Sequence, residues 1–243
     1  MPTTMETRIE LQDVSFAYDG GGPMFTGVGC SVGAGEVLAI VAPVGEGKST
    51  LLKVCAGILR PSRGQLIIDG RQFWNLSTIE QNDMRRRMGF NFQEAALIAN
   101  MSISNNLALP LRYHGELSES KIRELIDEWL RRLGLVAYRD SLPAALSLGL
   151  RRRVSFIRAM LAGDDFFFWD EPTQEASVDF SDLVVQTVMD KKRQGAAQVM
   201  VTQNADLMKS AADRAIVIQG GKVRYYGPLR EGGIPVDISA DRR

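Results

Sequence analysis

The nine residues from Ala42 to Thr50, Ala-Pro-Val-Gly-Glu-Gly-Lys-Ser-Thr, have the residue types and the spacing of a phosphate-binding loop. They match the pattern G-x-x-x-x-G-K-[ST], except that Ala42 stands at the first glycine. The apolar run 36–41 precedes the loop with strand character, and residues 51–56 continue it as a helix, which is the context that the motif requires. Backbone N–H groups at the start of this helix would therefore face a bound phosphate.

Each residue type in the loop has a defined role toward phosphate. Gly45 and Gly47 let the backbone curl around phosphate oxygens without a Cβ clash. Lys48 places a positive charge near the outer phosphates, and the hydroxyl of Ser49 is a ligand for Mg²⁺. We expect the loop to tolerate Ala42, because alanine is costly there only if the position needs a positive φ angle. The predicted nucleotide contacts in the loop are Val44, Gly45, Glu46, Gly47, Lys48, Ser49 and Thr50.

A second group of chemically active residues follows the apolar run Phe166–Trp169. Asp170 and Glu171 stand directly after this run. A buried strand that ends in two carboxylates delivers them to the edge where open α/β sheets carry ligand chemistry. We expect Asp170 to hold Mg²⁺ through water and Glu171 to orient and deprotonate an attacking water. The alternative is a strand end with two solvated acids, but the phosphate loop elsewhere in the chain argues against it.

Strands and helices alternate on both sides of a helical block. Before the block, the pattern predicts strands over 8–16, 24–32, 36–41, 65–70 and 88–92, and helices from the phosphate loop to about residue 59 and over 77–88. The helical block covers 104–158, and after it we expect a strand over 166–169, a helix over 180–193, a strand over 198–202 and a hairpin over 215–226. This order predicts a mostly parallel α/β core with an inserted helical subdomain.

We assign a single domain to residues 6–230, with the helical subdomain at about 94–160 and a loosely ordered tail over 231–243.

The chain has 29 Lys and Arg and 29 Asp and Glu, so its formal net charge is zero, which argues against a nucleic-acid partner. The two cysteines, Cys30 and Cys55, suggest a reducing compartment. We expect no signal peptide at Met1–Glu6 and no membrane span, because no stretch approaches about 20 apolar residues.

Taken together, these motifs resemble the ATP-binding subunits of ABC transporters over residues 9–227. The resemblance implies further site residues. Tyr18 matches the aromatic residue that stacks on adenine, and Gln93 matches the glutamine that senses Mg²⁺ and the attacking water. Gln203 stands where the family has its switch histidine. The implied catalytic residues are therefore Glu171, Gln93 and Gln203, and the implied Mg²⁺ ligands are Ser49, Gln93 and Asp170.

The segment Leu146–Leu150 sits where the family carries its Leu-Ser-Gly-Gly-Gln signature. In that family two subunits sandwich two ATP molecules, and the signature of one subunit caps the γ-phosphate that the other binds. The resemblance therefore implies that Ser147 and Gly149 contact nucleotide across a dimer. Leu148 and Leu150 replace a glycine and a polar residue of this signature.

The resemblance implies an ABC ATPase fold: a P-loop NTPase core with a mostly parallel sheet, an N-terminal antiparallel β subdomain and an inserted helical subdomain. It implies ATP and Mg²⁺ as ligands, and a second ATP-binding subunit, expected to be an identical chain, as one partner. The other implied partner is a transmembrane permease that holds the chain at the cytoplasmic face of the cell membrane. Within the family, the stretches 84–90 and 105–111 look most like the branch that drives MCE-type phospholipid transport.

Several departures from the family pattern fall at catalytic positions. Glutamine at 203 can donate a hydrogen bond but cannot become cationic as histidine can. Ser177 replaces an aspartate of the family, with Asp179 two residues later. The only histidine, His114, precedes a turn signal at Gly115, so we expect it on the surface. The residues that would bind Mg-ATP thus match the family pattern better than the residues that would control its hydrolysis.

These departures leave three interpretations open. The first is a transporter ATPase whose hydrolysis is weak or depends on a partner. The second is a pseudo-enzyme that binds ATP and has a structural or regulatory role. The third is a soluble ABC protein of DNA repair or translation, but such proteins carry two cassettes or long insertions.

Two arginine runs and one apolar segment lie outside these motifs. We expect Arg85–Arg87 and Arg151–Arg153 to form solvated helix faces, with some arginines pairing to nearby acids. Residues 94–104 are unusually apolar for a loop. By resemblance this segment would receive a helix of the membrane subunit, and core packing is the alternative.

Overall fold

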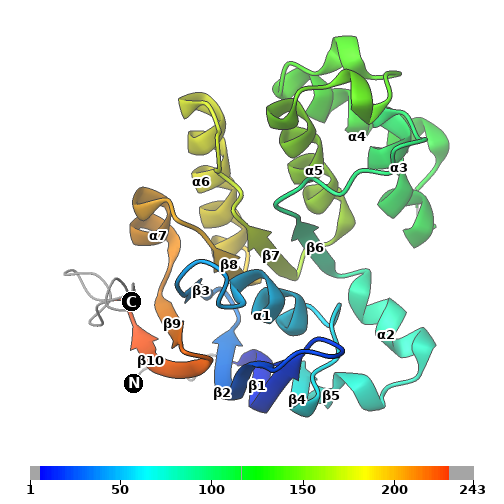
Figure 1. Cartoon of the computed structure of the whole chain (residues 1–243). Helices are drawn as coiled ribbons and strands as arrows, with labels where there is room; N and C mark the ends of the chain where they lie inside the picture. The colour runs from blue at the N-terminus through cyan, green and yellow to red at the C-terminus, as the bar shows by residue number, and fades with distance from the viewer. Residues whose placement is uncertain (1–5, 116, 230–243) are drawn as a thin grey trace.

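The computed structural model describes residues 6–115 and 117–229. Two β-sheets form its centre (Figure 1). The first sheet is antiparallel, with the strand order β2 (Pro23–Gly33), β1 (Thr7–Ala17), β4 (Arg63–Ile68) and β5 (Arg71–Gln72). The second has the order β10 (Lys222–Pro228), β9 (Arg214–Gln219), β3 (Val37–Val41), β8 (Ala197–Val201), β7 (Phe166–Asp170) and β6 (Met88–Asn91). Only the β10–β9 pair of the second sheet is antiparallel. The predicted mostly parallel core and the N-terminal antiparallel sheet are confirmed.

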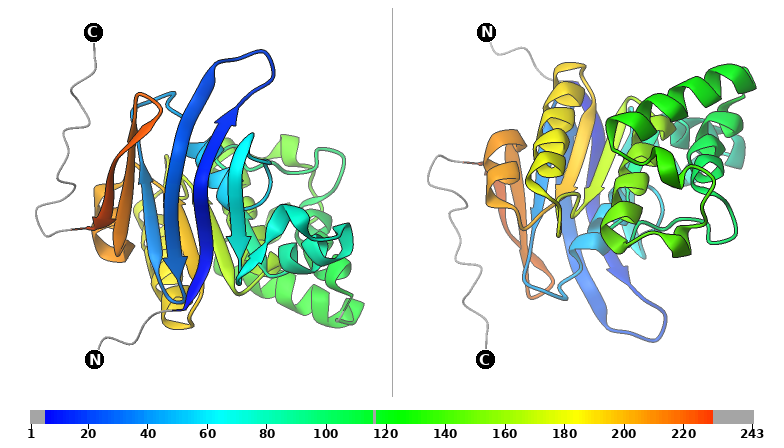
Figure 2. Two further views of the ribbon diagram at one scale, coloured as in Figure 1. Left: turned by 90° about the horizontal axis from the view of Figure 1, so that it is seen from below. Right: turned by 90° about the horizontal axis from the view of Figure 1, so that it is seen from above.

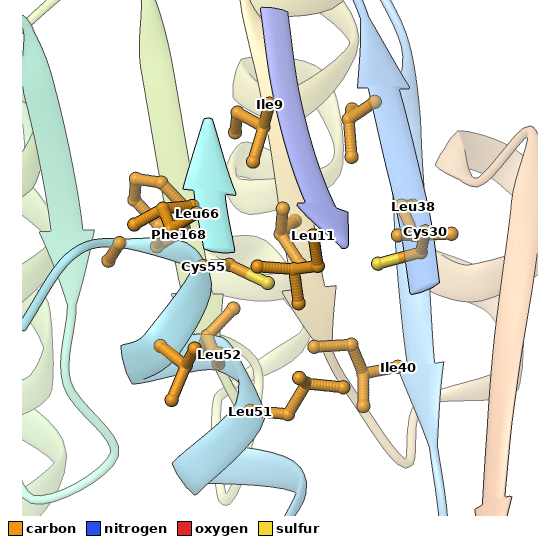
Figure 3. Packing of buried hydrophobic residues seen from close by; sticks show 14 of the residues in the cluster. Ile9, Leu11, Cys30, Leu38, Ile40, Leu51, Leu52, Cys55, Leu66 and Phe168 are labelled. Carbon is orange, nitrogen blue, oxygen red and sulfur yellow. The ribbon is translucent and has the colours of Figure 1, made fainter. Parts of the chain in front are cut away.

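The six-stranded sheet separates two hydrophobic cores, and β7 shows how the sequence fills both. Successive side chains of a strand point to opposite faces, so Phe166 and Phe168 enter the first core while Phe167 and Trp169 enter the second. The first core lies between the two sheets and includes α1 (Lys48–Cys55). In Figure 3, Leu51 and Leu52 of α1 lie with Leu11 of β1 and Ile40 of β3 in one cluster.

The second core lies on the opposite face of the sheet. It is covered by α6 (Val178–Arg193) and α7 (Ala205–Ala211), as the two views of Figure 2 show. The same core continues into the helical insert, whose buried residues belong to the same cluster. The smaller elements are α2 (Thr78–Arg85) and three 3-10 turns, Phe73–Asn75, Val136–Tyr138 and Pro143–Ala145.

The helical insert consists of α3 (Ile103–His114), α4 (Glu119–Arg132) and α5 (Leu148–Ala162), gathered beyond β6 (Figure 1). Each helix begins after a serine whose hydroxyl accepts a hydrogen bond from the third backbone N–H that follows: Ser102, Ser118 and Ser147. In α4 three apolar side chains spaced four residues apart, Ile122, Ile126 and Leu130, are buried. Helix α5 packs against β6 and thereby joins the insert to the sheet.

Several helix boundaries and one helix differ from the sequence-based prediction. Helix α1 ends at Cys55 rather than near residue 59, because Gly57 adopts a left-handed φ of 63° and closes the helix. Helix α2 ends at Arg85 instead of residue 88. Helix α7 was not predicted, although Asn204 gives a signal: its side chain accepts hydrogen bonds from the N–H groups of Asp206 and Leu207.

Part of the predicted domain organisation lies outside the described residues. Of the stretch 231–243, interpreted above as a loosely ordered tail, the structure describes none. Within residues 6–115 and 117–229, no helix is both long and apolar enough to cross a bilayer.

Candidate functional site

A cavity of about 360 Å³ opens beside the phosphate loop, at the carboxyl edge of the parallel strands. The structure brings ten of the predicted site residues together in its wall: Tyr18, Val44, Gly45, Gly47, Lys48, Ser49, Thr50, Gln93, Glu171 and Gln203. Met24 and Val201 also line it, and neither carries a motif that sequence reasoning could have used. Loops that follow β3, β6, β7 and β8, together with the start of α1, supply most of this wall, so the fold assembles residues that lie far apart in the sequence.

The phosphate loop has the backbone that its glycines predict. Gly45 and Gly47 both have a φ angle of 84°, a conformation that favours glycine. A Cβ atom on Gly47 would also lie 2.7 Å from the side chain of Met24. Ala42 is buried and is not among the described residues with positive φ, so this position does not need glycine's conformational freedom.

Lys48 is the first residue of α1 and curls back over its own loop. Its Nζ donates hydrogen bonds to the carbonyl oxygens of Ala42 at 2.8 Å and Pro43 at 3.0 Å. Burial lowers the pKa of this ammonium, and the nearby carboxylates of Glu171 and Asp170 partly oppose that shift. The first turn of α1 contains no acidic residue, so the positive end of the helix and the Lys48 ammonium both favour an anion in the cavity.

The two predicted Mg²⁺ ligands of the core lie in contact. The hydroxyl of Ser49 donates to Oδ1 of Asp170 at 2.9 Å. Asp170 is buried behind Ser49 rather than in the cavity wall. Burial raises the pKa of the Asp170 carboxyl, and the hydrogen bond from Ser49 and the charges of Lys53 and Lys48 oppose the rise. Paired hydroxyl and carboxylate oxygens suit a hard cation such as Mg²⁺.

Glu171 is buried and has an unusual backbone conformation, with φ at 49°. One carboxylate oxygen, Oε2, accepts a hydrogen bond from the backbone N–H of Gln203 at 3.0 Å. The other, Oε1, is buried and has no hydrogen-bond partner within the described residues. A buried acceptor without a partner is costly, so Glu171 fits a site whose ligand or water supplies the missing donor.

Of the remaining predicted site residues, some lie at the rim of the cavity and others lie away from it. Tyr18 is 48 % exposed, and its hydroxyl is 3.1 Å from Oγ1 of Thr50. The side-chain amide of Gln93 donates to Oε1 of Gln174 at 3.2 Å. The carboxylate of Glu46 accepts from the backbone N–H of Gly220 at 2.7 Å, and Glu46 is absent from the cavity wall. The side chain of Glu46 therefore bonds outside the cavity, and the contact of Glu46 with nucleotide stays a prediction.

The signature residues Ser147 and Gly149 do not join this cavity either. Ser147 caps α5, with its hydroxyl accepting from the backbone N–H of Leu150 at 3.3 Å. Leu148 is 38 % exposed, and a Cβ atom on Gly149 would meet no atom within 4 Å. The start of α5 thus presents an accessible surface that includes a leucine side chain, and the role of Ser147 and Gly149 toward a second subunit stays a prediction.

The arginine runs differ from the solvated faces that we predicted. Arg87 pairs with Asp69 at 2.7 Å and with Asp165 at 2.6 Å, which confirms local pairing, but the arginines of both runs are half-buried. Arg152 donates hydrogen bonds into the loops beside the cavity. His114 lies at the end of α3 and is partly exposed, in line with the surface position expected for it. For the arginines a physical reason is that their aliphatic stems can cover apolar surface while the charged ends reach polar partners.

The segment 94–104 is packed into the core only in part, and its contact with a membrane subunit stays a prediction. Ala95 and Ile103 are buried, whereas Ala96, Ala99 and Asn100 are exposed. Arg158 of α5 donates to the carbonyl oxygens of Ala95 at 3.1 Å and Ala96 at 2.9 Å. The segment is therefore packed against α5 on one side and open on the other.

The fold with this site defines the class of ABC ATP-binding cassettes. The dimeric, post-hydrolysis structure of the ATP-binding cassette MJ0796 bound to ADP and Pi aligns with a TM-score of 0.82 and 26% identity, over 91% of this chain and 99% of that one. A model of the ABC transporter family matches residues 25–174. The chain belongs to the ABC transporter family, and within it to the ATP-binding, ABC ATPase component.

Curated relatives differ in the transport that their names describe. The chain is 33% identical over 225 residues to a methionine import ATP-binding protein MetN of Caulobacter vibrioides, covering 92% of this chain and 68% of that protein. It is 31% identical over 223 residues to the intermembrane phospholipid transport system ATP-binding protein MlaF of Haemophilus influenzae, covering 91% and 84%. Against the probable ribonucleotide transport ATP-binding protein mkl of Mycobacterium leprae the identity is 31%, and the chain covers 65% of that length. The chain thus spans about two thirds of the MetN and mkl proteins it matches.

Proposed function

We propose that this chain is the subunit that drives a membrane transporter by binding and hydrolysing Mg-ATP. One observation carries the proposal: the same cavity is lined by the Lys48 ammonium, the Ser49 hydroxyl and a buried Glu171 carboxylate with an unpartnered oxygen. A phosphate-binding loop alone would support binding. The addition of a positioned carboxylate supports hydrolysis, because a general base must lie within reach of the attacking water.

The residues present fit both ATP and Mg²⁺. Lys48 would exchange its contacts with backbone carbonyls for the outer phosphates, and half-exposed Tyr18 would stack on the base. Ser49 and Asp170 would hold Mg²⁺, which supplies charge neutralisation on the phosphates when bound. The cavity volume of about 360 Å³ lies in the range of small-molecule sites.

The chain's own residues would then divide the work of hydrolysis. The backbone N–H of Gln203 holds one oxygen of Glu171, which leaves Oε1 to take a proton from water. The side chains of Gln93 and Gln203 line the same cavity and can donate hydrogen bonds to the water or to the γ-phosphate. Gln203 stays neutral in this role, which supports a slow rate compared with a site that contains a cationic donor.

A groove beside the insert supports a permease partner. It has a volume of about 450 Å³ and lies between α2, β6, α3 and α5. Its wall is mainly apolar, and the polar side chains in it are basic: Arg85, Arg86, His114 and Arg158 are joined by Met88, Phe90, Phe92, Leu109, Pro110, Tyr113, Ala159 and Ala162. An apolar groove with a basic margin suits an amphipathic helix with acidic residues. Such a helix from a permease would hold the chain at the cytoplasmic face of the membrane.

Phospholipid is the cargo that we propose. The MlaF relative supports it, because the chain covers 84% of that protein's length, whereas it covers about two thirds of the MetN and mkl proteins. A second copy of the chain is the proposed dimer partner. The dimeric MJ0796 structures support a dimer, in which Ser147 and Gly149 of one copy would cap the nucleotide of the other.

The second candidate function is an ATP-binding pseudo-enzyme, which the exposed Leu148 and the neutral Gln203 favour. Phosphate release from Mg-ATP by the purified chain at high concentration separates the two, with Glu171→Gln as the blank. Release above the blank is the result we expect. If there is none and the double variant Gln203→His, Leu148→Gly releases phosphate, the pseudo-enzyme is the better account.

A further inference from the structure

Arg152 connects the helical insert to both loops that carry the proposed hydrolytic residues. It lies in the second turn of α5, and its side chain is only 13 % exposed. Its guanidinium donates to the backbone carbonyl of Gln93 at 3.2 Å and to that of Gln174 at 3.0 Å. It also donates to the side-chain oxygen of Gln174 at 3.3 Å and to the carboxylate of Glu175 at 2.8 Å. One side chain thus bonds to the Gln93 loop and to the loop that follows Glu171.

The side chain of Gln174 completes the connection. Its Oε1 atom accepts from Arg152 and also from the side-chain amide of Gln93. The position of the Gln93 amide therefore depends on Gln174, and that of Gln174 depends on Arg152. Gln93 and Glu171 both line the cavity, whereas Arg152 and Gln174 do not.

The two loops that Arg152 joins are the strained ones. Six described residues other than glycine have positive φ angles, and four of them fall in these loops: Ala95, Ala96, Glu171 and Glu175. Residues without glycine's freedom hold such angles only where the surroundings determine them. Arg152 supplies part of those surroundings, and Arg158 of the same helix holds the carbonyl oxygens of Ala95 and Ala96.

We infer that Arg152 is a positioning residue that ties the orientation of α5 to the placement of Gln93 and Glu171. This inference rests on the proposed function, because it concerns hydrolysis in the same cavity. Among the described residues Arg152 forms no hydrogen bond with the phosphate loop, so we expect nucleotide binding not to depend on it. A displacement of the insert would pull on Gln93 and on the Glu171 loop together. The contact makes hydrolysis sensitive to any partner that moves α5.

The test is Arg152→Gln, compared with Arg139→Gln as the matched control. Arg139 also lies in the helical insert; it bonds to Asp127 at 2.9 Å and forms a longer ion pair with Asp140 at 3.9 Å. For Arg152→Gln we expect kcat for ATP hydrolysis to fall about 10- to 100-fold, because small displacements of reacting groups are costly. The Kd for ATP should stay unchanged. Arg152→Lys keeps the charge and should recover part of kcat, whereas Arg139→Gln should change neither quantity.

Hydrogen exchange supplies a readout that needs no hydrolysis. The backbone N–H groups of Ala95, Ala96, Gln174 and Ala176 form hydrogen bonds within the two loops. We expect these amides to exchange faster in Arg152→Gln than in the wild type, because local opening becomes easier. The control variant should match the wild type.

The outcomes separate this inference from the proposed function. Unchanged exchange in both loops, or faster exchange with an unchanged kcat, overturns the role of Arg152. A parallel loss of kcat and of ATP affinity also overturns it, because that result indicates general damage. If the wild type releases no phosphate at all, the proposed function fails, while the exchange data still decide whether Arg152 holds the loops.

Discussion

In the phosphate loop, positive φ angles occur at Gly45 and Gly47, whereas in the two loops beside it they occur at alanine and glutamate residues. The first loop is held by its own backbone and by the side chain of Lys48. The other two are held by arginines of α5, a helix that belongs to the insert. The comparison suggests that phosphate binding is a local property of the sequence. The placement of the hydrolytic groups depends instead on Arg152 of α5, which lies 59 residues from Gln93 and 22 residues from Gln174 along the chain.

The largest effect is expected from Lys48→Ala, which tests the claim that the phosphate loop binds the nucleotide. Lys48 is the only lysine or arginine in the wall of the described cavity. Its loss should weaken ATP affinity about 100-fold, which corresponds to about 3 kcal/mol. Isothermal titration calorimetry with ATP measures this directly. Lys209→Ala, an exposed lysine of α7, is the control and should bind ATP as the wild type does.

The variant Gln203→His tests the claim about hydrolysis. A histidine at this position adds a donor that can become cationic, so kcat should rise about tenfold or more. The ATP affinity should change little, because the phosphate loop is untouched. Phosphate release in an assembled complex is the measurement. An unchanged rate would mean that Gln203 does not limit hydrolysis.

The variant Asp170→Asn removes a predicted Mg²⁺ ligand, and we expect it to affect stability and hydrolysis in opposite directions. Burial raises the pKa of Asp170, so the Asp170 carboxylate binds a proton more tightly in the native state than in the unfolded chain. Protonation of Asp170 therefore contributes favourably to the free energy of unfolding. This contribution is complete at pH values below the ordinary carboxyl pKa and is lost as the pH rises through the raised pKa of the native state. Asparagine can keep the hydrogen bond from Ser49 without a buried charge.

We therefore expect Asp170→Asn to have a higher free energy of unfolding than the wild type at neutral pH and to lose Mg²⁺-dependent hydrolysis. The stability difference should disappear in acid. Urea denaturation at several pH values measures it, and a variant that is less stable at neutral pH would contradict the assignment of a desolvated carboxylate.

The smallest effect is expected from Ala42→Gly, which restores the usual first glycine of the motif. Ala42 does not have a positive φ angle, so glycine relieves no strain there. The added freedom of the unfolded chain should lower the free energy of unfolding by about 0.5–1 kcal/mol. ATP affinity should stay the same. A clear gain in affinity would show that alanine impairs the loop.

Local signals were sufficient to predict the phosphate loop, the acid pair and the mostly parallel core, whereas the N-terminal antiparallel sheet was expected from the family resemblance. Spacing defines Lys48 and Ser49, and the alternation of buried aromatic residues defines β7. The sequence gives no comparable signal for Arg152, because an arginine run on a helix has the same pattern whether it faces solvent or a loop. The positive φ angle of Glu171 and the rotation of Glu46 toward Gly220 arise from tertiary contacts, so no local rule predicts them.

The most direct test of the account is a titration of Mg-ATP into Glu171→Gln, with phosphate release measured on the same samples. The account predicts wild-type affinity for ATP with loss of phosphate release, because Glu171 acts on water and Lys48 and Ser49 hold the nucleotide. Affinity that falls as far as in Lys48→Ala, or phosphate release equal to that of the wild type, would contradict the separation of binding from hydrolysis.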